Sequence, residues 1–326
     1  MPDPKPNLEQ LHDQLKLAQA AGDPWKEGIA LNNLGGYHKD RRETDKAVEY
    51  FQKALEYFSV LQDQEKKATV FNNLGGVYHD ARQYQKALEY FALALGTYGF
   101  LGQPFGQGMA LNNLGGVHLA QKRYEDAKKQ FGMAASFFRA AQAHTWEAQA
   151  IENLAAAEAG LGNRKGAVDS YGRALDLWQK LDQLDRQGMI LNRIAAMHSA
   201  AGESKRAMEL HYRALVLAQK SQNFSLEINT NFNIGRLLFE SREWRAAQEH
   251  FEDAGRLCEQ HGEKKGQALA LLSLGKISLA SGKDLLRAAA AMFAEIGDSA
   301  GEQNALDLIP ASPDPLPEVE ASQKPA

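Results

Sequence analysis

The sequence predicts an all-α protein built as a right-handed α-α superhelical solenoid, with about seven helical hairpins and a capping helix at each end. Two observations lead to this prediction: a hexapeptide that returns every 40 residues, and apolar residues at helical spacing. The hexapeptide is Leu-Asn-Asn-Leu-Gly-Gly at 31–36 and 111–116, and Phe-Asn-Asn-Leu-Gly-Gly at 71–76. Weaker copies begin at 151, 191, 231 and 271. A period of this length is typical of stacked repeats, in which each repeat contacts its neighbours.

Each repeat contains the pattern of two amphipathic helices, over about 26–41 and 45–60 in the first copy. The first helix has leucine or a similar residue followed by glycine or alanine, as at Gly35. The second has alanine and, four residues later, an aromatic ring, as at Ala47 and Phe51. Such spacings place side chains on one helical face. We expect the small residues to let the two helices of a hairpin approach closely, and the ring to fill the space to the next hairpin.

The ends of the chain differ from the repeats. Residues 1–7 have no helical pattern, and residues 310–326 are rich in proline and poor in apolar side chains, so we expect both segments to be disordered. Between them we expect one solenoid over residues 8–309. Its predicted parts are a lead helix at 8–21, repeats that start near 26, 66, 106, 146, 186, 226 and 266, and a C-terminal cap at 299–309.

These residues resemble the tetratricopeptide repeat, whose first helix carries Leu-Gly and then tyrosine, and whose second carries Ala-x3-Phe. Leu34-Gly35 and Ala47-x3-Phe51 match this signature, and the copies 40 and 80 residues later match it too. Tyr78 occupies the tyrosine position, whereas His38, His118 and His198 replace it in other copies. The 40-residue form with Asn-Asn-Leu-Gly is similar to the repeats of kinesin light chains and of LGN/Pins adaptors. The resemblance covers about residues 26–297 and implies an interaction module that binds peptides.

Composition excludes several classes of function. The net charge of −4 favours neither a nucleic-acid partner nor an anionic membrane surface. The single cysteine, Cys258, excludes an intramolecular disulfide and a multi-thiolate metal site. No apolar run of membrane-spanning length occurs, and no signal-peptide pattern is present at the start. We therefore expect a cytoplasmic protein that does not insert into membranes.

A candidate peptide-binding groove follows from the first-helix residues that packing does not use, because these should line the concave side of a superhelix. A repeated Asn pair in a helix interior costs roughly half a kcal/mol per residue relative to alanine, so it needs a reason. Asparagine amides can pair with the main chain of an extended peptide, and the glycines beside them leave room for it. The predicted groove residues are Asn32, Asn33, Gly36, Lys39, Asn72, Asn73, Gly76, His79, Asn112, Asn113, Gly116, Asn192, Arg193 and Arg236.

Two interpretations of the asparagines remain open at this point. Their amides could contact a bound peptide, as asparagines of this helix do in the families that the chain resembles. They could instead hydrogen-bond the neighbouring repeat and set its stacking angle. Farther along, Arg193, Arg236 and Lys276 could receive an acidic side chain or a C-terminal carboxylate through charge-assisted bonds. Ordinary surface charge is the alternative for these three cations.

The functional prediction is a non-catalytic adaptor or scaffold that binds a peptide or disordered segment of a partner protein in the groove. None of the nine histidines forms a zinc-binding pair on a helix, and no nucleophile has a sequence-linked base, so we expect no enzyme activity, no metal and no cofactor. We expect a monomer. The alternative is a self-associating scaffold whose solenoids dock through groove residues, namely Leu119, Phe232, Phe239 and Leu279.

Overall fold

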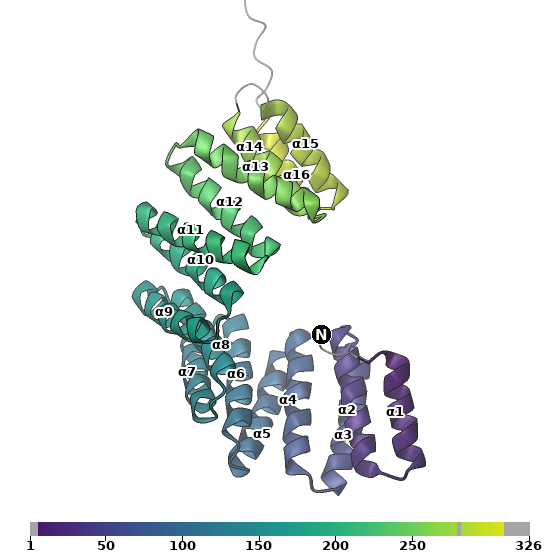
Figure 1. Ribbon diagram of the computed structural model, residues 1–326. Helices are drawn as coiled ribbons and strands as arrows, with labels where there is room; N and C mark the ends of the chain where they lie inside the picture. Colours follow the sequence, from purple (N-terminus) through teal and green to yellow (C-terminus); the bar gives the residue numbers. More distant parts are fainter. Residues whose placement is uncertain (1–5, 279–281, 310–326) are drawn as a thin grey trace, which may run out of the picture. The chain divides into compact units, whose positions relative to one another are not determined.

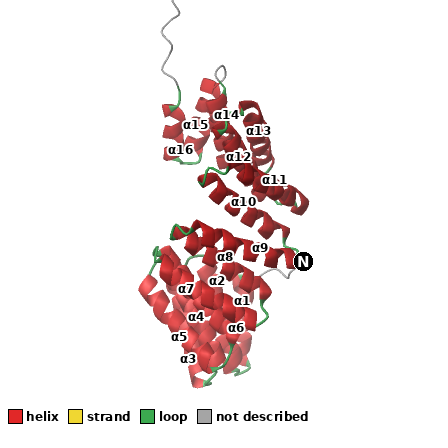
Figure 2. Cartoon of the chain, turned by 90° about the vertical axis from the view of Figure 1, so that its left-hand side faces the viewer, coloured by secondary structure: helices red, strands yellow, loops and turns green. Residues whose placement is uncertain are grey.

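The computed structural model describes residues 6–278 and 282–309, which form sixteen helices and contain no strand (Figure 2). The all-α prediction is confirmed. The chain divides into two compact units, unit 1 over Met1–Leu181 and unit 2 over Asp182–Ala326. The predicted disordered tail, 310–326, and most of the predicted disordered N-terminus, 1–7, lie outside the described residues.

Helices follow one another as antiparallel hairpins within each unit (Figure 1). Unit 1 contains α1 Leu8–Ala20, α2 Pro24–Asp40, α3 Thr44–Val60, α4 Gln64–Asp80, α5 Tyr84–Phe100, α6 Pro104–Ala120, α7 Tyr124–Ala140, α8 His144–Gly160 and α9 Arg164–Lys180. Unit 2 contains α10 Leu184–Ala200, α11 Ser204–Ser221, α12 Phe224–Glu240, α13 Trp244–Gln260, α14 Lys264–Ile277, α15 Gly282–Glu295 and α16 Ser299–Asp307. Several helices are capped at their N-terminus by a side chain. The Asp23 and Asp63 side chains, for example, accept hydrogen bonds from the backbone N–H of Lys26 and Lys66.

The turns between consecutive helices from α1 to α14, and the turn between α15 and α16, share one backbone conformation. After α2, the N–H of Arg42 donates to the carbonyl of Lys39, and the N–H of Glu43 donates to that of His38. This pairing is the Schellman type of helix end, and it requires a left-handed residue. Glycine holds that position at Gly22, Gly102, Gly162, Gly202, Gly262 and Gly297, whereas other residues hold it at Arg42, Gln62, Arg82, Lys122, Gln142, Asp182, Gln222 and Arg242.

Glycine at the strained turn positions should stabilise the fold. Gln62 and Gln142 are exposed and have φ of 54° and 55°, so replacing both by glycine removes Cβ strain without changing the charge. We expect a gain of about 1–2 kcal/mol for the pair, measured as a shift of the urea unfolding midpoint. Gln103→Gly is the control, because Gln103 has φ −99° and Gly102 already occupies the left-handed position of that turn. An equal gain in the control would contradict this explanation.

In four hairpins the aromatic ring of the second helix packs against the glycine of the first helix. A Cβ added at Gly35 would lie 2.7 Å from the Phe51 ring, and one added at Gly75 would lie 2.6 Å from the Phe91 ring. The same pairing joins Gly115 with Phe131 and Gly235 with Phe251. Phe51 also belongs to the buried cluster that continues into α4 and α5, so the ring contributes to the packing within its own hairpin and to the core shared with the next one. The ring lies over the glycine because no Cβ is there to exclude it.

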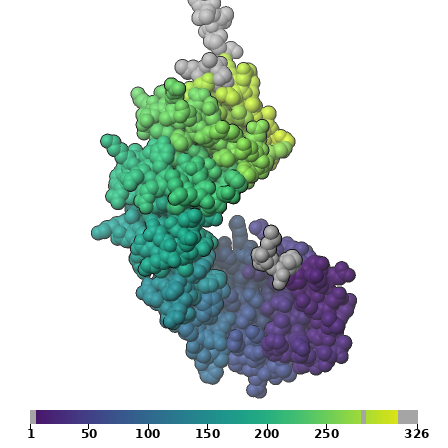
Figure 3. Space-filling view, in the orientation of Figure 1, coloured from purple at the N-terminus to yellow at the C-terminus, as the bar shows by residue number. Residues whose placement is uncertain are grey.

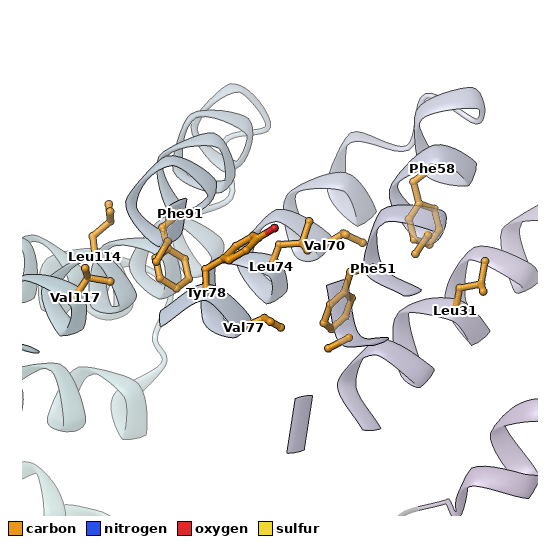
Figure 4. Packing of buried hydrophobic residues seen from close by; sticks show 13 residues of the cluster. Leu31, Phe51, Phe58, Val70, Leu74, Val77, Tyr78, Phe91, Leu114 and Val117 are labelled. Atoms are coloured by element: carbon orange, nitrogen blue, oxygen red, sulfur yellow. The ribbon is translucent and has the colours of Figure 1, made fainter. Parts of the chain in front are cut away.

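Neighbouring hairpins are joined through a continuous core. In unit 1 a buried cluster that includes Leu31, Phe51, Leu74, Phe91 and Leu114 runs through three successive hairpins (Figure 4). In the space-filling view the side chains of successive helices in each unit close the gaps between them (Figure 3). The first helices of successive hairpins also contact one another, as in α2 with α4, α4 with α6 and α6 with α8, whereas the described second helices make no comparable contact. The first helices therefore define the inner side of each stack, where the predicted groove residues lie.

Candidate functional site

The repeated asparagines of unit 1 form hydrogen bonds between successive first helices, which we call the asparagine ladder. The Nδ2 of Asn73 donates to the Oδ1 of Asn32 over 2.9 Å. The same bond joins Asn113 to Asn72 over 2.8 Å and Asn153 to Asn112 over 3.0 Å. The ladder ends at α8, where Glu152 replaces the next acceptor and accepts instead from Trp178. These three bonds fix the register between neighbouring repeats, so the bracing role considered from the sequence is present.

The asparagine ladder leaves half of each amide without a protein partner. Asn32, Asn72 and Asn112 accept through Oδ1, and their Nδ2 groups make no hydrogen bond within the described residues. Asn73, Asn113 and Asn153 donate through Nδ2, and their Oδ1 atoms accept none there. All six side chains are half-buried. The inner side of α2, α4, α6 and α8 therefore presents N–H donors and carbonyl acceptors in alternation, and a peptide main chain carries groups that can pair with both kinds.

The second glycine of each Gly-Gly pair differs from the first. A Cβ at Gly36 or Gly116 would meet no atom within 4 Å, so the surface is open there. Gly76 is covered by the end of the Lys39 side chain, whose Nζ would lie 2.9 Å from such a Cβ. His79, the counterpart of Lys39 in the next repeat, is half-buried and lies 3.5 Å from the Asp80 carboxylate. Lys39 can move away from Gly76, since it is a flexible side chain.

A pocket of about 730 Å³ lies where the asparagine ladder meets α1. It brings together five of the predicted groove residues, namely Asn32, Asn33, Gly36, Lys39 and Asn73. Leu11 of α1 contributes to its wall, and so do Tyr37 and Arg41, whose guanidinium lies 3.5 Å above the Tyr37 ring. The predicted groove residues did not include Leu11, Tyr37 or Arg41. Asn153 lies 40 residues after Asn113, and its place in the repeat had put it at the edge of the same helical face.

In unit 2 the matching polar positions are used for internal packing. The Nδ1 of His211 donates to the Oδ1 of Asn192 over 2.7 Å, and the Nδ2 of Asn192 donates to the Oγ1 of Thr230 over 2.7 Å. Both sides of the Asn192 amide are therefore engaged. Arg193 is exposed beside it. His211 is fully buried in the position that Phe51 occupies in the first repeat, and burial lowers its pKa to about 4.

Arg236 lies in a second pocket, of about 490 Å³, in unit 2. Phe232, Phe239 and Lys276 also line this pocket, so the structure brings together four residues that the sequence placed along the groove. Of the residues considered for self-association, Leu119 packs against the buried Ala127, Phe131 and Ala157, and Leu279 lies outside the described residues. Phe232 and Phe239 are half-buried against the core of unit 2.

The part of the chain that the structure describes holds no group of three or more histidine, cysteine or acidic side chains able to bind a metal ion. None of its helices combines the length and apolar character that crossing a bilayer requires.

The fold and the repeated site define a helical-repeat protein of the kind that presents extended binding surfaces. Residues 26–98 and 106–180 match the family model described as tetratricopeptide repeat. Over these residues the chain consists of tetratricopeptide repeats, and the resemblance seen in its motifs is confirmed there. A comparison with curated proteins found no match.

Solved structures with the same fold share little sequence with this chain. Aspartyl phosphate phosphatase F from Bacillus subtilis is 18% identical, with 85% of this chain and 77% of that chain covered and a TM-score of 0.58. The kinesin light chain TPR-like repeats from Podosopora anserina are 15% identical, with coverages of 61% and 98% and a TM-score of 0.52. The Rap conjugation gene regulator of plasmid pLS20, solved with the Phr* peptide, is 13% identical, with coverages of 87% and 78% and a TM-score of 0.52. At these identities the comparisons establish the fold alone.

Proposed function

We propose that unit 1 is a non-catalytic protein-interaction module that binds an extended segment of a partner protein along the asparagine ladder. The observation that carries this proposal is the alternation of unpaired Nδ2 donors and Oδ1 acceptors on α2, α4, α6 and α8. An extended segment exposes its own N–H and C=O groups along its edges. The asparagine side chains of the ladder can form hydrogen bonds with these groups whatever side chains the segment carries.

Two further features support the proposal. Gly36 and Gly116 leave open space beside the asparagines, so a main chain can approach the helix backbone there. The pocket bounded by α1 can receive one end of the segment, and Lys39 and Arg41 contribute cations to its lining. The Rap regulator with this fold was solved with a peptide, which is consistent with the proposed class of ligand. The partner must be ordered on binding, so we expect affinity in the micromolar range.

The test adds two methyl groups to the proposed surface without removing any contact. Peptides are selected with the full chain from a displayed library of random segments, and their affinities are measured by fluorescence anisotropy. We expect Gly36→Ala with Gly116→Ala to weaken binding about tenfold or more, because each methyl group occupies space that the peptide main chain needs. The same substitutions should raise stability by about 1–2 kcal/mol in total, since both glycines are inside helices.

A matched control is available on the second helices. Gly96 of α5 and Gly132 of α7 also have no atom within 4 Å of an added Cβ, and neither lines the inner side of the stack. Gly96→Ala with Gly132→Ala should raise stability by a similar amount and leave peptide affinity unchanged. Equal affinities for the two double variants would overturn the proposed binding surface.

A further inference from the structure

The pocket around Arg236 combines an apolar wall with unpaired positive charge. Phe232 and Phe239 of α12 and Leu269 of α14 form the apolar part. Arg236 and Lys276 are exposed, and neither forms an ion pair with any described residue. Glu240 is the acidic residue in the lining, so the charges of the pocket sum to +1. Such a surface favours a ligand that carries carboxylates next to proline or aliphatic side chains.

The chain itself contains a segment with this chemistry, residues 310–326. It carries three acidic residues, Asp314, Glu318 and Glu320, against one basic residue, Lys324. Prolines at 313, 315 and 317 alternate with Asp314 and Leu316. Alternating prolines favour the polyproline II conformation, which docks onto aromatic-lined grooves at a low entropic cost.

The start of this segment is tied to the same helix that lines the pocket. Ile309 packs against a cluster that contains Ala268 and Leu272 of α14, and Leu269 and Lys276 of α14 line the pocket. The path from Ile309 to the pocket is thus of the order of one or two helix spacings, or about 20 Å. Seventeen residues in polyproline II can span about 50 Å, so the segment is long enough to reach.

We propose that the acidic, proline-rich segment 310–326 docks onto the pocket formed by Phe232, Arg236, Phe239 and Lys276 of the same chain. Leu316 and its neighbouring prolines contact the two phenylalanine rings, and the carboxylates of Glu318 and Glu320 pair with the two cations. The docked segment covers this part of unit 2. The inference does not rest on the proposed function of unit 1.

The charge of its lining distinguishes this pocket from two other pockets of unit 2. One pocket, of about 690 Å³, is lined by Glu249, Glu252, Asp253 and Glu259, and its Arg256 is already paired with Asp253. The other, of about 470 Å³, is lined by Asp185 and Glu263 and contains no lysine or arginine. Both repel an acidic segment, whereas the pocket around Arg236 attracts it.

The experiment follows the segment in the full chain with a fluorophore on Ser322→Cys. The label should react there alone, because Cys258 is fully buried and burial raises the pKa of its thiol. We expect high fluorescence anisotropy that is independent of protein concentration. In the Arg236→Glu, Lys276→Glu variant the anisotropy should fall about twofold, since the fluorophore then moves with a flexible chain. Adding Glu318→Lys and Glu320→Lys to that variant should restore it, because the charges are then exchanged.

The matched control reverses two cations elsewhere in unit 2. Lys205 and Arg206 of α11 are exposed, form no ion pair with a described residue and do not line the pocket. Lys205→Glu with Arg206→Glu changes the net charge equally and should leave the anisotropy high. Low anisotropy in the parent chain, an equal fall in the control, or a failure of the exchanged charges to restore docking would each overturn the proposal. Anisotropy that rises with protein concentration would assign the segment to a second copy and would overturn docking within one chain.

Discussion

Replacing Gly35 by alanine is expected to destabilise unit 1 by about 1–3 kcal/mol. The added Cβ would lie 2.7 Å from the Phe51 ring, and Phe51 is fully buried in the cluster that joins three hairpins. A rigid ring in a packed core cannot move aside without displacing its neighbours. The measurement is the urea unfolding midpoint followed by circular dichroism, with the slope checked for a change in cooperativity.

The neighbouring glycine supplies the control for this prediction. Gly36 lies in the same helix, but a Cβ there would meet no atom within 4 Å, so Gly36→Ala should stabilise by about 0.5–1 kcal/mol. The cost at Gly35 should also shrink when Phe51→Leu is present, because the smaller side chain removes the contact. Two adjacent substitutions of the same type with equal effects would show that the ring contact does not determine the stability.

Unit 2 is expected to lose stability as the pH falls from 6.5 towards 4, by up to about 3 kcal/mol from His211 alone. Burial lowers the pKa of His211 from 6.5 to about 4, and the nearby Arg236 acts in the same direction. Since the unfolded chain titrates near 6.5, it binds more protons than the folded chain between these two values, and protonation favours unfolding. The stabilisation is complete above pH 6.5 and is lost as the pH approaches 4.

The physical cause is the environment of the His211 ring. Its Nδ1 donates to Asn192, while its Nε2 is buried without a partner among the described residues, so a second proton would have no acceptor there. Burial lowers the pKa of His250 as well, which adds to the same trend. His211→Gln keeps a donor for Asn192 but cannot titrate in this range. The pH dependence of unfolding should therefore be smaller in the variant than in the parent chain, and identical pH profiles would contradict the assignment.

The helical repeat could be predicted from the sequence because its determinants are local. The spacing of apolar residues and the 40-residue step do not depend on distant contacts, and α2 and α3 begin and end within two residues of the ranges expected for the first hairpin. The left-handed turns were only partly visible. Glycine marks some of them, but Arg42 and Gln62 adopt the same conformation because the packing of the flanking helices imposes it.

The candidate site was less accessible to sequence reasoning. The 40-residue repeat placed the asparagine pairs on the first helix of each hairpin. Their low helix propensity indicated that they have a role beyond helix formation. The sequence could not show that Asn73 donates to Asn32, because that bond joins residues 41 apart and depends on how the two repeats are rotated. Asn192 illustrates the limit further, since its amide is engaged by His211 and Thr230 rather than by an asparagine of the next repeat.

The sequence by itself determined that this protein is a stack of helical hairpins, because each hairpin is specified by short-range spacing and repeats are stabilised by their nearest neighbours. The tertiary structure decided what each repeated residue does. It placed Phe51 over Gly35, turned half of every ladder amide towards a neighbouring helix, and brought Arg236 and Lys276 to one pocket. These outcomes depend on distances between helices, and such distances are set only when the side chains of neighbouring repeats pack together.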